Sequence, residues 1–106
     1  MPSGQDYHGA LMDAMAEARD ALGRMAPLGR AKAEAERAYR IAKRTRILWE
    51  RGENGTPVSI ISDVVCGYDD IAALRFARDC ADAEYEANRE ALLLAKKQVD
   101  TVREII

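Results

Sequence analysis

The chain has 106 residues and a formal net charge of −2, with 48% hydrophobic but only 6% aromatic residues. This length suits one domain, and abundant alanine with few bulky side chains favours closely packed helices over a β-rich fold. The mild acidity gives no global basis for binding nucleic acid or an anionic membrane.

The first expected elements are a disordered segment over residues 1–6 and a helix over residues 7–26. Pro27 lacks an amide donor and clashes with the carbonyl four residues earlier, which predicts a kink or a short break before the next helix. The sequence leaves open whether the two helices are continuous through Pro27. The expected packing seam has a spacing of three and four residues: Leu11, Met15, Ala18, Leu22 and Met25.

A second helix is expected over residues 31–51, ended by a turn between Gly52 and Gly55. Residues 30–51 hold eight basic and three acidic residues, so this helix is basic, whereas residues 52–106 hold six basic and eleven acidic residues. The apolar residues of the helix form this predicted seam: Ala31, Ala35, Ala38, Ala42, Thr45 and Trp49.

A short helix is expected over residues 57–66, with Thr56 as its N-cap, Pro57 at its first position and Gly67 at its end. It is apolar almost all round. Such a helix is either buried at the end of a bundle or a contact surface.

The last expected helix covers residues 69–105, with Asp69 and Asp70 favouring its start. Along this helix, residues at intervals of three or four positions form a single heptad seam. These residues are Ile71, Leu74, Arg78, Ala81, Tyr85, Asn88, Leu92, Ala95, Val99, Val102 and Ile106. A second apolar row faces nearly the opposite way: Ala73, Phe76, Cys80, Ala83, Ala87 and Leu94. Two opposed faces predict two neighbours, within the chain or from a second copy.

The predicted fold is therefore all-α: one helical domain over residues 1–106, arranged as a coiled-coil-like hairpin. It has a kinked N-terminal arm, a short connecting helix and a long C-terminal helix. Such a fold exposes much apolar edge, so we expect a homo-oligomer.

Catalytic and metal sites find no support in the sequence. His8 is the only histidine, no Glu-x-x-His pair is present, and Cys66 and Cys80 form no CxxC motif. No disulfide framework, signal sequence or membrane span is indicated. We expect a cytoplasmic protein that is not an enzyme and needs no metal or cofactor.

Anion binding is one alternative for the basic helix, because guanidinium groups grip phosphate and an aromatic ring can stack on a base. The opposing interpretation is that these arginines pair with acidic residues of the chain. Arg78 and Tyr85, one heptad apart, could line an anion pocket, although Arg78 and Asn88 more simply fix the helix register. The candidates are Arg37, Tyr39, Arg40, Arg44, Arg78 and Tyr85.

Protein docking is the other site hypothesis, and the competing interpretation is that the same apolar side chains cap the hairpin core. The candidates are Trp49, Val58, Ile61, Val65 and Phe76.

Three short stretches suggest a relationship: Ala-Tyr-Arg-Ile-Ala-Lys at 38–43, Thr-Pro-Val-Ser-Ile-Ile at 56–61 and Leu-Arg-Phe-Ala-Arg-Asp at 74–79, followed by Tyr85, Glu86 and Ala87. With them, residues 38–94 resemble small, mostly uncharacterised helical proteins encoded by phages and prophages of gut bacteria. The resemblance implies an accessory role in the cytoplasm of a bacterial host, with no assigned activity.

On that basis we expect an inhibitor that docks on a host defence component such as a CRISPR effector. The first alternative is an oligomer that binds a nucleotide signal or single-stranded nucleic acid through the basic helix. The second is a structural coiled-coil component of a phage complex.

Overall fold

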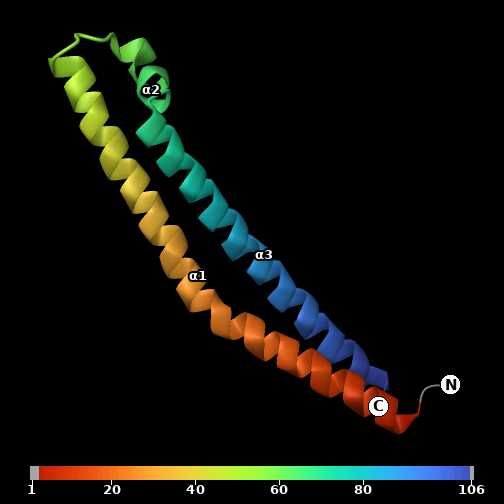
Figure 1. The fold of residues 1–106 in the computed structure, drawn as a ribbon. Coiled ribbons are helices and arrows are strands. Elements are labelled where there is room, and N and C mark those ends of the chain that lie inside the picture. The colour runs from red at the N-terminus through yellow and green to blue at the C-terminus, as the bar shows by residue number, and fades with distance from the viewer. Residues whose placement is uncertain (1–2, 106) are drawn as a thin grey trace. The chain divides into compact units, whose positions relative to one another are not determined.

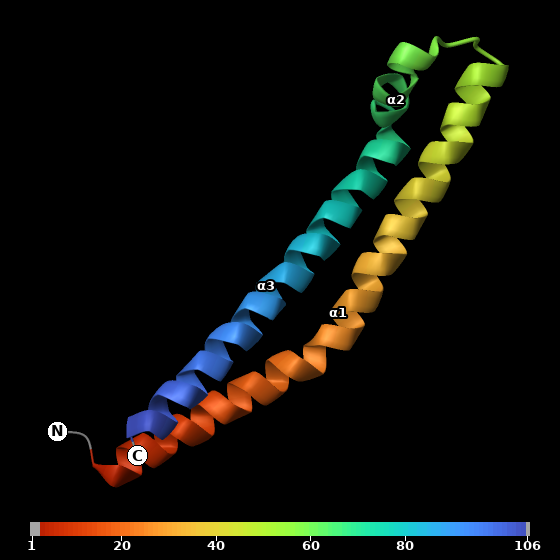
Figure 2. The ribbon, with the colours of Figure 1, turned by 180° about the vertical axis from the view of Figure 1, so that it is seen from behind.

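The structure is a computed structural model that describes residues 3–105. It has an all-α, hairpin-like fold of three helices, α1 (Gly4–Gly52), α2 (Val58–Cys66) and α3 (Asp69–Ile105), with no strand among the described residues (Figure 1). The contacts divide into two compact units. Unit 1 joins the chain up to Gly29 to the chain from Glu84 onward, and unit 2 is Arg30–Ala83. Within each unit, α1 and α3 run antiparallel (Figures 1 and 2).

Helix α1 passes through Pro27 without a break, which resolves the alternative left open by the sequence. Pro27 is exposed, and burial keeps the same spacing on both sides of it, through Met25, Leu28, Lys32 and Ala35. A continuous helix keeps this packing face in phase. We attribute the continuity to that packing, which offsets the roughly 3 kcal/mol that proline costs inside a helix.

The start of α1 also differs from the disorder expected for residues 1–6. The backbone amide of Ser3 donates to the Asp6 carboxylate at 2.8 Å, and the Asp6 amide donates to the Ser3 hydroxyl at 3.2 Å. This reciprocal pair is a capping box, in which both side chains satisfy backbone donors at the helix start. The Ser3 amide and the Ser3 hydroxyl both donate to the Asp6 carboxylate, and these two hydrogen bonds lower the pKa of Asp6. Residues 1 and 2 lie outside the described residues.

The seam predicted for α3 is the face that packs. Ile71 is fully buried, Asn88, Leu92 and Ala95 are buried, and the remaining seam residues up to Val102 are half-buried. The second apolar row is exposed, except for half-buried Cys80. Thus one of the two apolar faces of α3 is covered within the chain.

The seams predicted for α1 are partly wrong. In unit 1, Leu22 is 60% exposed and Ala21 is buried in its place. In unit 2, the predicted seam residues Ala35 and Ala42 are half-buried, but Ala38 and Trp49 are exposed. The buried positions are instead Tyr39 and Glu50, one residue after each of these two. The prediction placed alanine rather than polar residues on the packed face of α1. Polar side chains can be buried there because each of them has a partner on a neighbouring element.

The core of unit 2 lies where α1, α2 and α3 meet. It consists of Tyr39, Ile61, Val65 and Ile71, with half-buried Ala42, Ile47, Tyr68 and Leu74 packed around it. α2 begins after Pro57, which is its N-cap. Thr56 was expected to cap this helix, but its hydroxyl donates to Glu50 at 2.6 Å instead.

Candidate functional site

Tyr39 is a core residue with cations on its ring. The Arg78 guanidinium lies 4.5 Å and the Lys43 ammonium 5.8 Å from the centroid of the Tyr39 ring. The hydroxyl lies 3.6 Å from the Cys66 sulfur. Because Tyr39 is buried and its ring is already in cation–π contact, it cannot stack on a base as the sequence interpretation required.

Arg78 is held in a half-buried position by acidic neighbours. Its guanidinium donates to Asp79 at 2.9 Å and lies 3.6 Å from the Glu36 carboxylate. The hydrogen bond to Asp79 raises the pKa of Arg78, so the side chain stays charged. Glu36 also pairs with Arg40 at 2.6 Å. These contacts support the expectation that some of the arginines pair within the chain.

An open groove of about 840 Å³ adjoins these residues. Its lining includes four basic side chains and two acidic ones: Arg40, Lys43, Arg75, Arg78, Glu36 and Asp63. We call this site the basic groove. Arg75 makes no ion pair within the described part of the chain, so it is the cation most available to a ligand.

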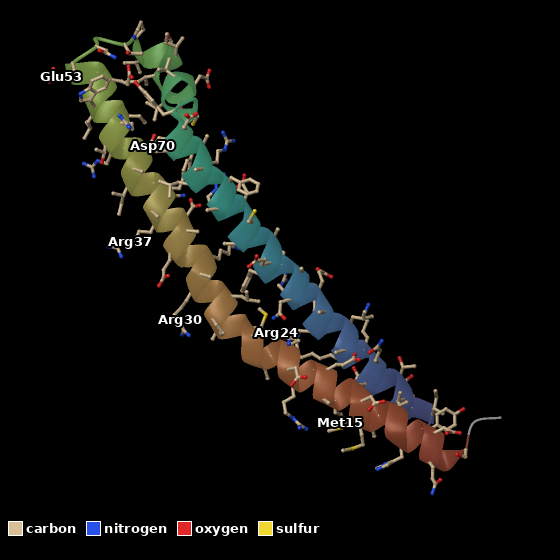
Figure 3. The ribbon with its side chains drawn as sticks, viewed as in Figure 1. Met15, Arg24, Arg30, Arg37, Glu53 and Asp70 are labelled. Atoms are coloured by element: carbon tan, nitrogen blue, oxygen red, sulfur yellow. The ribbon has the colours of Figure 1, made fainter. Side chains whose placement is uncertain are left out.

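The basic groove gathers only part of the predicted anion set. Tyr39, Arg40 and Arg78 line it, but Arg37 and Arg44 are exposed and lie outside it. Figure 3 shows Arg37 on the outer side of α1. Tyr85 belongs to unit 1, where its ring packs near Gly29, so it shares no unit with Arg78.

Lys43 and Arg75 were missed as groove residues, although the sequence held a signal for both. Lys43 follows Tyr39 by four residues, and Arg75 precedes Arg78 by three, so each lies on the same helical face as a candidate. This spacing alone could not place the two residues in a groove, because tertiary packing decides which faces of α1 and α3 lie next to each other.

The predicted docking residues divide into two groups. Ile61 and Val65 are buried in the core, as the capping interpretation expected, whereas Trp49, Val58 and Phe76 are exposed. On α2, Ile60 and Val64 are exposed as well. The nine-residue α2 therefore buries one apolar face and exposes another. We call the exposed pair Ile60 and Val64, which lie four residues apart on one side of α2, the α2 patch. Val58 is exposed on a different side of the helix.

Glu50 is a buried carboxylate that the sequence interpretation overlooked. It accepts hydrogen bonds from the hydroxyls of Thr56 and Tyr68 and from the amide of Asn54 at 3.3 Å. These hydrogen bonds lower the pKa of Glu50, and the one with Tyr68 raises the pKa of that phenol. Glu50 thus ties the end of α1 to the loop and to the start of α3, a structural role.

In unit 1, the buried seam residue Asn88 makes two hydrogen bonds to α1. Its amide donates to the Ala21 carbonyl at 2.8 Å, and its oxygen accepts from Arg24 at 3.1 Å. In Figure 3, Arg24 lies on the side of α1 that faces α3. A polar side chain paired across a seam fixes which residues lie opposite each other. This geometry fits the expected role of Asn88 in setting the register.

Within residues 3–105, no cluster of three or more His, Cys, Asp or Glu side chains could hold a metal ion. In the same range, no helix is both long and apolar enough to cross a bilayer. Comparisons with protein families, curated proteins and solved structures found no match for this chain. The resemblance to phage-encoded proteins therefore stays a prediction.

Proposed function

We propose that this chain is a binding protein without enzymatic activity, and that it acts by docking on another protein through the α2 patch. The observation that carries the proposal is the exposure of Ile60 and Val64, one turn apart, on a helix whose other face is core. Ile60 is 49% exposed and Val64 is 39% exposed. Neighbouring apolar side chains left in water on a short, anchored helix are typical of a protein contact surface.

The surroundings of the α2 patch indicate the kind of partner. α2 contains one acidic residue, Asp63, and no basic residue, and acidic Glu53 and Asp69 flank it along the chain. The basic groove adjoins the other side of α2, through Ser62 and Cys66. An apolar surface with an acidic rim complements an apolar surface with a basic rim. This chemistry agrees with the expected class of target, a host defence component such as a CRISPR effector, whose nucleic-acid channel is basic.

A phage infection assay tests this proposal. Host strains with a defined defence system would be infected with and without the protein, and we expect it to restore plaque formation in at least one strain. The double variant Ile60→Ser with Val64→Ser should lose this effect. The matched control Ile41→Ser with Leu48→Ser also removes two exposed apolar side chains, but from α1. Plaque formation that is the same with the α2 variant as with the unmodified protein would reject the α2 patch as the docking surface.

The second candidate function is the binding of a small anion, such as a phosphorylated nucleotide signal, in the basic groove. The observation that favours it is the convergence of Arg40, Lys43, Arg75 and Arg78 in one groove. Because Tyr39 cannot stack on a base, recognition would rest on the phosphate groups, which arginine binds through paired hydrogen bonds.

Calorimetric titration with cyclic and linear nucleotides distinguishes this candidate. Binding should weaken steeply with added salt and be lost in Arg40→Ala with Arg75→Ala. The control Arg37→Ala with Arg44→Ala removes the same charge outside the groove and should bind normally. An absence of binding at low salt eliminates the candidate. Self-assembly as the only detectable activity would favour the structural coiled-coil alternative.

A further inference from the structure

Unit 1 has a second surface that the proposed function leaves unused, a groove with a basic edge. It is lined by the apolar side chains Met15, Ala18, Leu22, Leu92 and Val99 and by the charged side chains Arg19, Lys96, Arg103 and Asp100. Its volume is about 430 Å³, and Leu22 on its wall is 60% exposed. Three basic residues against one acidic residue give this groove a net charge of +2. We call it the plus face.

Two adjoining pockets lie on the other flank of the same helix pair and share Glu17 and Gln98. Their apolar lining is Ala10, Ala14, Ala21, Ala91, Leu94, Ala95 and Val102. Their charged side chains are Asp13, Glu17, Asp20 and Arg24, a net charge of −2. Leu94 stands out from this surface, with 59% of it exposed. We call it the minus face.

The two faces lie on opposite sides of one packing seam. On α1, Met15 and Arg19 belong to the plus face, and Asp13 and Glu17 to the minus face. On α3, Lys96 and Arg103 belong to the plus face, and Ala91 and Gln98 to the minus face. A helix pair has one groove on each side of its seam, so a copy can bind a neighbour on each side.

We propose that unit 1 binds a second copy of this chain with the minus face of one copy seated on the plus face of the next. The net charges of the faces are equal and opposite. Asp13 and Asp20 are one heptad apart on α1, and Lys96 and Arg103 are one heptad apart on α3. Each interval is about 10.5 Å along a helix, so the matching spacing allows both acidic side chains to pair with a basic one in the same docked arrangement.

A symmetric pairing of like faces is disfavoured, because it would set +2 against +2 or −2 against −2. When the minus face of one copy meets the plus face of the next, each copy instead brings an exposed leucine, Leu94 or Leu22, to the shared apolar surface. Such a contact is heterologous, so a pair of copies still has one free face at each end. Further copies can add there, until a ring closes or an open chain forms.

Charge reversal and mixing test this pairing by sedimentation velocity. Asp13→Lys with Asp20→Lys makes both faces basic, and Lys96→Glu with Arg103→Glu makes both faces acidic. Each variant alone should associate at least about tenfold more weakly than the unmodified protein, because only like charges can meet. An equimolar mixture of the two should recover the assembly. Added salt should weaken association of the unmodified protein.

The control Arg37→Glu with Lys97→Glu changes net charge by the same amount as the Lys96 and Arg103 variant, but at exposed positions outside both faces. It should assemble normally, and circular dichroism checks that every variant stays helical. Three results would each overturn the proposal. They are an unmodified protein that stays monomeric at all concentrations, single variants that assemble as well as the unmodified protein, and a mixture that does not recover assembly.

Discussion

Ile71 and Phe76 lie five residues apart on α3, and their burial predicts a large loss of stability when Ile71 is changed to alanine but almost none when Phe76 is. Ile71 is fully buried in the core of unit 2 with Tyr39, Ile61 and Val65, whereas Phe76 is 71% exposed. Composition alone would rank the larger aromatic side chain as the more important one. The pair therefore tests which face of α3 is packed.

The magnitude for Ile71→Ala follows from the atoms removed. Three buried carbon groups at about 0.8 kcal/mol each give roughly 2.4 kcal/mol of lost burial. The cavity adds to this, so we expect the free energy of unfolding to fall by about 3 kcal/mol, within the roughly 2–5 kcal/mol typical of this substitution. At about 4 °C per kcal/mol, the melting temperature would fall by about 12 °C.

Phe76→Ala should change the free energy of unfolding by no more than about 0.5 kcal/mol, because an exposed side chain loses little burial and alanine is the better helix former. Urea unfolding followed by circular dichroism measures both variants. The protein concentration must be the same throughout, since self-association would make stability depend on it. A Phe76→Ala loss equal to or larger than the Ile71→Ala loss would refute the assigned packing face.

Three further predictions concern single positions. The pKa of Glu50 lies below its ordinary value of 4.5, so the ionised carboxylate stabilises the fold above that pH. This stabilisation is lost as the pH falls toward the lowered pKa, and Glu50→Gln should therefore flatten the acid side of a plot of melting temperature against pH. Gly23→Ala should raise the free energy of unfolding by about 0.5–1 kcal/mol, because a Cβ at this position within a helix meets open space. Gly55→Ala should lower it, because φ at Gly55 is +64°. Chemical denaturation should therefore show changes of opposite sign for the two variants. Pro27→Ala should restore a backbone donor inside α1 and raise the melting temperature; an unchanged or lower value would show that proline costs nothing at this position.

The phase of α3 follows directly from the sequence. No glycine or proline interrupts residues 69–105, and the heptad repeat singles out Ile71, Leu92 and Ala95 as packing residues. The all-α class and the turn between Gly52 and Gly55 follow from equally local signals. These features depend on the intrinsic periodicity and backbone freedom of a few neighbouring residues, which is why they can be read without a structure.

The partners of the polar side chains depended on tertiary structure. Tyr39, Arg46 and Glu50 lie on the packed side of α1 because Cys66, Asp70 and Tyr68, far along the chain, supply contacts for them. The same packing separates Arg37 from Arg40 and brings Arg75 into the basic groove. Local sequence sets which faces a helix has, but the long-range contacts that compensate each buried polar group decide which face is used.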